Sequence, residues 1–417
     1  MASIAIIGGG IIGSAAAVWL IADGHRVTVF ERAPEGRPAS TGNAGLIALP
    51  EISPLARPGI LTSVPGWLLD PLGPLTIRFR DLPYLAPYLA RFVAAARPSV
   101  VRSATAALAT LSKTALADHQ ELARRGGLSG HLRRTGAFHV FDTDAAFQSA
   151  QAEWAERGRH GVESREVAAD EVRRVVPALS GAFARALFAP DYWAVSSPNA
   201  ILQALRRRIA EAGTITAKQV VSFRSDPGTV AVITGEGGDL PFDRVVVAGG
   251  VWSRELLQTV GISVPLVAER GYNTTYPNSR IDLPVPVFFA EHGFVATPLA
   301  DGLRVGGAVE LASPDAPPNF ARAAAMRKKM RRFVPDLPEA GGIEWMGSRP
   351  STPDSLPVIG ADPRDPRIVY AFGHGHHGLT QSAVTARLIA GLLAGRPDPA
   401  LKPFAVERFG RARGGRS

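Results

Sequence analysis

The sequence predicts two interleaved domains, one of the α/β class around a parallel sheet and one of the α+β class with an antiparallel sheet. Three observations support this. The chain has 417 residues, more than one ordinary core organises. A strand–helix–strand pattern opens it, and alternating strand patterns return near its middle. Hydrophobic residues make up 46% and charged residues 20%, as expected of a globular protein.

The first half of the chain supplies the opening βαβ unit and then a mixed region. A helix over 199–212 has Ser196 or Ser197 as its N-cap and Pro198 in its first turn. The other predicted elements are strands 3–7 and 26–31 around a helix over 11–23, helical periodicity over 84–125 broken at Pro98, and strands 136–141 and 182–188 around a helix over 145–157.

The second half returns to the first domain. Residues 244–248 read as a central parallel strand because three valines precede a glycine pair. Alternation predicts covering antiparallel strands at 285–289, 294–297 and 303–306, and the last helix is expected over 379–393. We predict a discontinuous first domain of residues 1–83, 197–262 and 343–417, and a second domain of residues 84–196 and 263–342.

Charge and hydropathy indicate which kinds of binding partner and which cellular location to expect for the chain. The formal charge of +9 comes from scattered arginines with a small cluster at Arg408, Arg411, Arg413 and Arg416. No basic run is interleaved with aromatic residues, so nucleic-acid binding is not expected. The first strand leaves no room for a signal peptide, which predicts a cytoplasmic protein. The apolar, Pro-rich residues 52–77 form either a packed loop or a surface that touches the inner face of a membrane.

The turn after the first strand has the G-x-G-x-x-G spacing, with Ile11 and Ile12 between its last two glycines. Gly8 permits the turn, Gly10 lets the backbone approach a pyrophosphate, and Gly13 lets the helix sit against the strand. Free N–H groups of that helix then face the phosphates. Glu31, 18 residues after Gly13, is placed to bind a ribose. A carboxylate at this position repels a 2′-phosphate, so NADP is disfavoured although Arg32 is its neighbour.

A second small, polar loop follows the ribose carboxylate. Its residues Ser40, Thr41, Asn43, Ala44 and Gly45 suit the far half of a longer dinucleotide, which favours FAD over NAD. The chain has no cysteine, so structural disulfides, thiolate metal sites, a cysteine nucleophile and a cysteinyl flavin link are excluded. We therefore expect non-covalent FAD.

With these two loops and the segments 245–253 and 347–360, the chain resembles the D-amino-acid oxidase and dehydrogenase superfamily, closest to bacterial D-amino-acid dehydrogenases of the DadA type. The resemblance covers nearly the whole chain. It implies a glutathione-reductase-like FAD domain and an antiparallel substrate domain over the flavin. It also places four further positions along the cofactor, namely Val220, Ala248, Gly249 and Trp252, and Gly347 opens the last of the matching segments.

The segment 372–380 places glycines and three histidines before a helix. In relatives this helix start faces the pyrimidine end of the flavin, where backbone donors and the helix dipole stabilise the reduced ring. The cofactor residues implied here are Gly375, His376, Gly378, Leu379 and Thr380. No carboxylate lies at ligand spacing, so no metal is expected. His376 and His377 are candidates for substrate selection.

The resemblance implies Arg349 as the group that grips a substrate carboxylate, because a guanidinium binds it with two parallel hydrogen bonds. Tyr272 is expected to donate its hydroxyl to the same carboxylate, and Arg270 to pair with Glu269 or another acid. His377 is expected to border the amine. Weaker candidates are His292 and Arg304 on the covering strands.

Together these features predict oxidative deamination of D-amino acids. Hydride passes from the α carbon to flavin and leaves an imino acid, then a 2-oxo acid, with oxygen or a quinone as electron acceptor. A rival hypothesis keeps FAD and changes the substrate to secondary amines such as sarcosine, D-proline or D-hydroxyproline. Two functions without turnover also remain open, a flavin-binding module and an NAD-binding regulatory protein.

Overall fold

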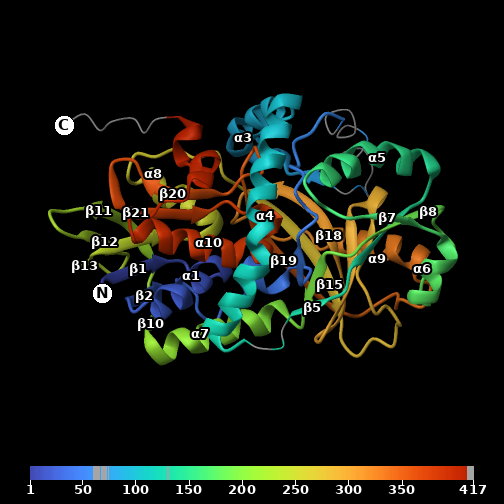
Figure 1. Cartoon of the computed structure of the whole chain (residues 1–417), viewed down its shortest axis with the longest axis horizontal. Helices are drawn as coiled ribbons and strands as arrows, with labels where there is room; N and C mark the ends of the chain where they lie inside the picture. The colour runs from blue at the N-terminus through green and yellow to red at the C-terminus, as the bar shows by residue number, and fades with distance from the viewer. Residues whose placement is uncertain (60–65, 67–72, 74, 129, 131, 411–417) are drawn as a thin grey trace.

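The computed structural model describes residues 1–59, 66, 73, 75–128, 130 and 132–410 (Figure 1). The apolar segment 52–77 therefore lies partly outside the described residues, and Arg411, Arg413 and Arg416 lie wholly outside them. Figure 1 shows the parallel sheet with its helices at the left and the antiparallel sheet with its own helices at the right. Between them runs the long helix α4 (Pro98–Gly126).

The first sheet has six strands in the order β10-β2-β1-β14-β21-β20, and only β20 runs antiparallel to its neighbour. Its strands are β1 (Ser3–Ile7), β2 (Arg26–Phe30), β10 (Thr214–Thr216), β14 (Arg244–Val247), β20 (Val358–Asp362) and β21 (Asp365–Phe372). Its central strands are runs of Ile, Val and Ala buried on both faces, as parallel strands covered by other elements require. The predicted central strand at 244–248 is confirmed.

One face of this sheet is covered by α1 (Ile11–Ala22), α7 (Pro198–Ala212) and α10 (Gly378–Leu393), with α4 packed on α1 and α10. Helix α1 carries no charge and is buried along most of its length because it is enclosed by these elements. Helix α7 begins as predicted, since the Ser197 side chain accepts a hydrogen bond from the Ala200 N–H and Pro198 occupies the first turn.

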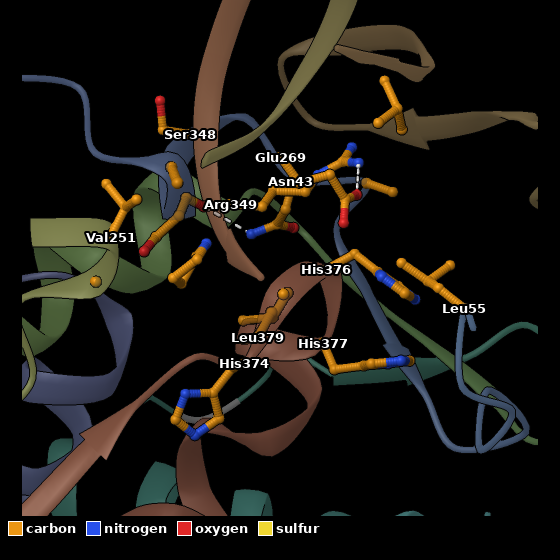
Figure 2. A pocket seen from close by; sticks show the side chains of 18 of the residues that line it. Asn43, Leu55, Val251, Glu269, Ser348, Arg349, His374, His376, His377 and Leu379 are labelled. Carbon is orange, nitrogen blue, oxygen red and sulfur yellow. Dashed lines mark hydrogen bonds and ion pairs between the residues drawn. The ribbon is translucent and has the colours of Figure 1, made fainter. Parts of the chain in front are cut away.

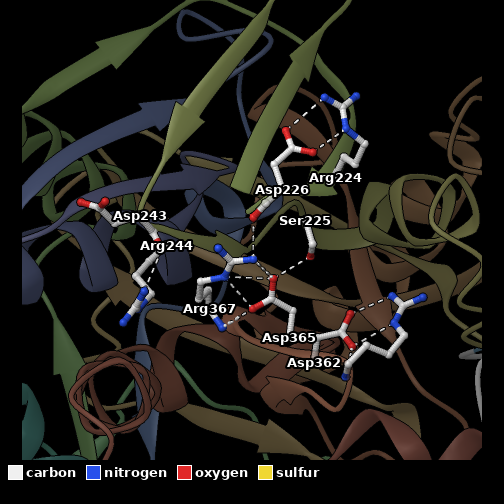
Figure 3. Close-up of polar contacts among 9 residues, drawn as sticks. Arg224, Ser225, Asp226, Asp243, Arg244, Asp362, Asp365 and Arg367 are labelled. Carbon is white, nitrogen blue, oxygen red and sulfur yellow. Dashed lines mark hydrogen bonds and ion pairs between the residues drawn. The ribbon is translucent and has the colours of Figure 1, made fainter. Parts of the chain in front are cut away.

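The other face is covered by the antiparallel strands β11 (Val220–Ser225), β12 (Val230–Thr234) and β13 (Asp239–Phe242), together with α8 (Ser253–Gln258). Apolar side chains from the two layers form one core. Polar contacts join their edges, as Figure 3 shows. Asp365 of β21 accepts hydrogen bonds from Arg367 and from Ser225 of β11.

The second sheet has nine strands. Eight follow the order β19-β15-β18-β17-β16-β6-β8-β7, and the ninth, β4, pairs with β18. Their bounds are β4 (Leu75–Ile77), β6 (Ala137–Phe141), β7 (Arg165–Val167), β8 (Arg185–Ala189), β15 (Val267–Tyr276), β16 (Val287–Phe289), β17 (Phe294–Leu299), β18 (Gly302–Ala312) and β19 (Ile343–Ser351). Most pairs are antiparallel, and β16 with β6 and β4 with β18 are parallel.

Strand β15 is buried along its whole length, and its alternation sorts its side chains between two environments. Even-numbered residues such as Tyr272 and Tyr276 pack with Met326 and Met330 of α9 (Ala321–Phe333). Odd-numbered residues such as Glu269 face the opposite side, where β15 meets the first domain. This alternation decides which of its residues reach the site.

The remaining described elements are a small sheet, further helices and 3-10 turns. A small sheet joins β3 (Leu46–Ala48) to β9 (Tyr192–Val195) and β5 (Leu132–Arg134). The other helices are α3 (Leu82–Ala95), α5 (Asp144–Arg159) and α6 (Ala169–Val175), and the 3-10 turns are η1 (Ala39–Gly42), η2 (Phe79–Asp81), η3 (Gly250–Trp252), η4 (Ala290–His292), η5 (Gly375–His377), η6 (Pro399–Phe404) and η7 (Val406–Phe409).

Two segments differ from the predicted domain boundaries. Strand β19 belongs to the nine-stranded sheet because it pairs with β15, whereas the boundary at residue 343 assigned it to the first domain. Helix α4 packs on α1 and α10 of the first domain, although residues 84–196 were assigned to the second. In both cases contacts with residues far away in the sequence determine where the segment lies. Local periodicity does not predict such contacts.

Candidate active site

A cavity of about 1720 Å³ lies between the two domains. Its walls come from the turn between β1 and α1, the end of β2, the loop 36–48, the ends of β14 and β21, and the first turn of α10. Strands β15, β18 and β19 close it from the other domain. A crevice at the carboxyl ends of parallel strands is the usual position of a nucleotide in such sheets.

Close backbone packing makes the glycines of the first turn necessary. Gly8 has a φ of +109°, and a Cβ there would lie 2.4 Å from the Ala248 carbonyl oxygen. A Cβ on Gly13 would lie 1.9 Å from the Gly8 carbonyl oxygen, so α1 rests directly on the strand. A Cβ on Gly10 would approach only Ser40 Oγ, at 3.6 Å, which leaves its cavity side open.

Glu31 ends β2 at the cavity wall. Its carboxylate accepts hydrogen bonds from the N–H groups of Gly9 (2.8 Å) and Ala33 (3.1 Å), which fix the side chain in place. The Arg32 guanidinium lies 3.7 Å from the centroid of the Trp252 ring, a cation–π arrangement. The buried indole N–H of Trp252 has no hydrogen-bond partner, so it is free to donate to a bound group.

The loop around residues 40–45 is held by both domains. Ser40 Oγ accepts a hydrogen bond from the Ile11 N–H at the start of α1. From the second domain, Arg304 donates to the Asn43 carbonyl oxygen at 2.7 Å, and Asn273 donates to the Gly42 carbonyl oxygen at 2.7 Å. Arg304, a weak substrate candidate from the sequence, therefore holds this loop.

Most of the predicted cofactor residues line this one cavity. They are Gly8, Gly10, Ile11, Ile12, Glu31, Arg32, Ser40, Asn43, Ala44, Val220, Ala248, Gly249, Trp252, Gly375, His376, Gly378, Leu379 and Thr380. Gly13, Thr41, Gly45 and Gly347 do not line it. A glycine-bordered helix start, a carboxylate at the end of β2 and an unpartnered indole N–H fit an extended dinucleotide such as FAD.

His374 and His377 at the start of α10 are buried and neutral, whereas the His376 side chain is exposed. Burial, with the neighbouring His377, lowers the pKa of His374 to about 3. Burial also lowers the pKa of His377. Figure 2 shows His376 and His377 pointing toward the side of Leu55, whereas His374 points the opposite way, where it contacts Thr385.

Arg349 lies in the cavity wall beside this turn (Figure 2). Its Nη1 is 3.0 Å from Glu269 Oε1, and the second oxygen of Glu269 accepts a hydrogen bond from the Ser351 hydroxyl at 2.7 Å. Glu269 and Arg349 are direct cross-strand partners on β15 and β19. Sequence reasoning named Glu269 only as a partner for Arg270 and so missed its contact with Arg349.

Tyr272 and Arg270 belong mainly to the other side of β15, which for Tyr272 is against expectation. The Tyr272 hydroxyl donates to Glu310 at 2.6 Å and accepts from the Asn319 N–H. Burial and the Glu310 hydrogen bond raise the pKa of Tyr272 to about 12. Although Tyr272 also borders the cavity, its hydroxyl is already engaged. The fully buried Arg270 pairs with Glu310 at 3.3 Å, which is the other acid that the prediction allowed beside Glu269.

His292 likewise lies apart from the cavity wall. It contacts Asp142 at 3.0 Å and packs beside Phe333. Its position just before β17 made it a candidate, but its ring is turned toward α9. Among the described residues, no group of three or more His, Asp or Glu side chains is arranged to hold a metal ion.

A buried polar network on the far wall of the cavity escaped sequence reasoning. Arg157 of α5 donates two hydrogen bonds to Glu51, at 3.1 and 3.0 Å, and Tyr192 donates to Glu51 at 2.5 Å. His139 contacts the Tyr192 hydroxyl. Burial opposes ionisation of Glu51, but Arg157 outweighs it and holds the pKa of the carboxyl well below its usual range. These residues lie far apart in the sequence, so no local motif marks them.

No helix in the described part of the chain is both long and apolar enough to cross a bilayer.

Comparison with known proteins gives a consistent result. A protein-family model described as "DAO: FAD dependent oxidoreductase" matches residues 3–392. The chain is 37% identical over 416 residues to a protein named D-amino-acid oxidase from Bradyrhizobium diazoefficiens, covering 97% of this chain and 98% of that one. It is 30% identical over 427 residues to a D-amino acid dehydrogenase from Paramagnetospirillum magneticum, with coverage of 97% and 98%.

Solved structures share the fold. Glycine oxidase from Geobacillus kaustophilus superimposes with a TM-score of 0.76 at 23% identity, covering 98% of each chain. L-proline dehydrogenase from P. horikoshii gives a TM-score of 0.72 at 18% identity, covering 98% of this chain and 97% of that one. At these identities the likeness concerns the arrangement of the two domains.

Proposed function

Because the chain belongs to the DAO family of FAD-dependent oxidoreductases and uses FAD, we propose that it oxidises free D-amino acids to imino acids, which water hydrolyses to 2-oxo acids and ammonium. The relatives named D-amino-acid oxidase and D-amino acid dehydrogenase support this substrate class. Their identities of 37% and 30% extend over nearly whole chains, so both domains contribute to the match.

One observation carries the proposal: Arg349 lies in the same cavity as the glycine-bordered start of α10. A guanidinium binds a carboxylate through two parallel hydrogen bonds, and it is more weakly hydrated than an ammonium, so it suits a partly enclosed site. The first turn of α10 offers N–H groups without intrahelical partners. The cavity therefore has a cation for the carboxylate of an amino acid and donors for a developing negative charge.

The chain's own residues then have distinct tasks. The bound FAD supplies the acceptor for the α-hydrogen, transferred as hydride. Arg349 holds the carboxylate and so orients the α carbon. The backbone donors at the start of α10 stabilise negative charge on the neighbouring ring system. The buried, neutral imidazole of His377 borders the amine without adding a positive charge, and the exposed His376 beside it contributes to substrate selection.

Anaerobic mixing tests the proposal. The purified holoenzyme is mixed with D-amino acids of varied side chain, with the matching L-enantiomers, and with glycine, sarcosine, D-proline and D-hydroxyproline. We expect the visible flavin absorbance to bleach with D-amino acids and the 2-oxo acid to form. Bleaching by sarcosine or D-proline alone would reassign the substrate to secondary amines, and a protein that never bleaches would be a binding module.

Arg349→Ala sharpens the test. We expect KM for D-amino acids to rise and kcat/KM to fall by roughly 100-fold, the effect of losing about 2 to 3 kcal/mol of charge-assisted hydrogen bonding, while FAD stays bound. Arg208→Ala, a surface change on α7 beside Glu211, is the matched control. Unchanged kinetics in Arg349→Ala would remove this residue from the substrate site.

The electron acceptor and any membrane contact belong to the same proposal. Air and a soluble quinone analogue, each added to the reduced enzyme, separate an oxidase from a quinone-linked dehydrogenase by the rate of reoxidation. We propose that residues 52–77, apolar and nearly uncharged, are the segment that would meet a membrane. Cosedimentation with lipid vesicles tests this, and recovery of all the protein in the supernatant would reject it.

A further inference from the structure

The guanidinium of Arg349 lies flat over Gly271 of the neighbouring strand. A Cβ built on Gly271 would come within 2.4 Å of Arg349 Nη2, 2.5 Å of Cζ and 2.7 Å of Nε. No real side chain tolerates such distances, so only glycine leaves room for this arginine conformation. Gly347 is the cross-strand partner of Gly271 and is covered in the same way. A Cβ built on Gly347 would lie 1.9 Å from the ring of Trp345.

Glu269 fixes one edge of the same guanidinium. Its carboxylate is nearly inaccessible to solvent and is itself held by the Ser351 hydroxyl at 2.7 Å, so it cannot follow a moving arginine. The contact at 3.0 Å uses Nη1 alone. Among the described residues, no hydrogen bond engages Nε or Nη2 of Arg349, and these two atoms form the edge that a carboxylate grips side-on.

We propose that Glu269 and Gly271 are positioning residues that present the Nε–Nη2 edge of Arg349 to a carboxylate ligand, and that the charge of Glu269 limits how tightly that ligand is held. The inference rests on the proposed function, because it takes Arg349 as the carboxylate site.

The negative charge of Glu269 weakens the binding of a second carboxylate at Arg349. Glu269 and Arg349 form a pair of zero net charge before a ligand arrives, and a bound carboxylate then lies near a second carboxylate. The repulsion offsets part of the attraction to the guanidinium. A site built this way binds substrate and releases an acidic product, whereas an unpaired guanidinium in the same place would hold both more tightly.

Titration of the FAD-loaded enzyme with benzoate and with benzamide tests this, with the perturbation of flavin absorbance as the readout. The two probes have the same shape, and only benzoate carries the charge. For Glu269→Gln, which keeps an oxygen facing Nη1 but removes the negative charge, we expect the benzoate Kd to fall by about tenfold and the benzamide Kd to stay unchanged. Glu344→Gln removes the same charge from the outer part of β19, where Glu344 pairs with Arg327, and should change neither Kd.

Gly271→Ala provides an independent variant, since it displaces the guanidinium without changing any charge. We expect benzoate binding to weaken by roughly tenfold and benzamide binding to persist. Gly360→Ala on β20, where a Cβ meets only ordinary contact at 3.8 Å, is the matched glycine control. If one of the two variants Glu269→Gln and Gly271→Ala does not retain FAD, the benzoate Kd of the other still tests the proposal.

The possible results distinguish the positioning role of Glu269 and Gly271 from the role of Arg349 as the carboxylate site. Equal shifts for benzoate and benzamide in Glu269→Gln, or weaker benzoate binding, would overturn the positioning role while Arg349 remains the carboxylate site. If Arg349→Ala leaves the benzoate Kd unchanged, the carboxylate site itself is wrong and the proposed function loses its main support.

Discussion

Single atoms decide the fit of the cofactor at the turn between β1 and α1. A methyl group on Gly13 would collide with the Gly8 carbonyl oxygen at 1.9 Å, which forces α1 away from the strand. We predict that Gly13→Ala lowers the FAD content of the purified protein by roughly tenfold or prevents folding, since neither neighbouring backbone can yield. The ratio of flavin to protein absorbance measures this.

Gly158→Ala is the control for that substitution. Gly158 lies within α5 with nothing within 4 Å of a built Cβ. Alanine is the better helix former there, so flavin content should be unchanged and stability equal or slightly higher. Normal FAD content in Gly13→Ala would contradict the packing argument.

Acid should destabilise the protein through His139. Burial lowers its pKa to about 3, although the Glu51 charge opposes this. An unfolded imidazole protonates near 6.5, so as pH falls below that value the unfolded state takes up the proton and the folded state does not. The free energy of unfolding should therefore fall by up to about 1.4 kcal/mol per pH unit per such histidine until the folded pKa is reached.

His139→Gln isolates this contribution, because its amide still has a donor for the Tyr192 hydroxyl. Urea unfolding between about pH 7.5 and about pH 5 should give a shallower pH dependence for the variant than for the natural protein. His160→Gln, at the partly exposed end of α5 beside Glu156, is the control. Parallel curves for natural protein and His139→Gln would show that His139 titrates normally.

Local motifs led us to expect the glycines and Glu31 at the cofactor site, whereas only the family resemblance led us to expect Arg349 at the substrate site. Neither predicted which side of β15 each residue occupies. Glu269 and Gly271 share a face with Arg349, whereas Tyr272 and Arg270 lie on the other face beside Glu310. The period-two alternation of a strand over 267–276 carried that signal, but the strand itself was not recognised as one element.

At the scale of elements, the strands β11–β13 depend on polar contacts with β21 (Figure 3). The Arg367 hydrogen bonds, opposed by partial burial and reinforced by Ser225, hold the pKa of Asp365 well below its usual range. Its contribution to stability is therefore full above the carboxyl's unfolded pKa and is lost as pH falls below it. We predict that Asp365→Asn lowers the free energy of unfolding at neutral pH by about 2 kcal/mol.

Urea unfolding checks this value, and the effect should shrink below about pH 4. Asp239→Asn breaks an exposed pair with Arg224 at 2.8 Å and should cost less than about 0.5 kcal/mol. Equal losses in both variants would mean that Asp365 contributes no more than a surface ion pair.

Elements with a strong local signal were predicted well, and those defined by distant partners were not. The opening unit, α7 and α10 combine caps, glycines and apolar stripes within a few residues. Strand β19 carries Gly, Ser, Arg and Pro, and it is a strand because β15 pairs with it along nine residues. Likewise the Glu51–Arg157 network joins residues 106 positions apart, which no local pattern reports.

At the scale of the whole molecule, the cofactor is expected to contribute to folding stability. The cavity takes its walls from both domains, so FAD binds the folded chain and has no site in the unfolded one. We predict that adding FAD at about 100 times its Kd raises the free energy of unfolding by about 2.7 kcal/mol over the apoprotein. Thermal melts of apoprotein with increasing FAD measure this, and a constant midpoint would contradict it.

The domain boundaries mark the limit of sequence reasoning at this scale. The chain crosses between domains several times, and each crossing was placed from a change in local pattern. Helix α4 follows α3 in sequence yet packs on α1 and α10, because its apolar stripe complements theirs. This complementarity involves residues that are far apart in the sequence, so local sequence patterns do not predict it.

The alternation of β15 has a practical consequence for redesign of the substrate range. Glu269 and Asn273 line the cavity and Gly271 lies under Arg349, while Tyr272 and Tyr276 pack on the helix behind the sheet and only Tyr272 of these two also borders the cavity. Substitutions at the odd positions should therefore change carboxylate binding, whereas substitutions at Tyr276 should mainly lower stability. Inserting one residue in this strand would exchange the two sets, turning the ion pair of Arg270 toward the flavin and sending Glu269 into an apolar layer.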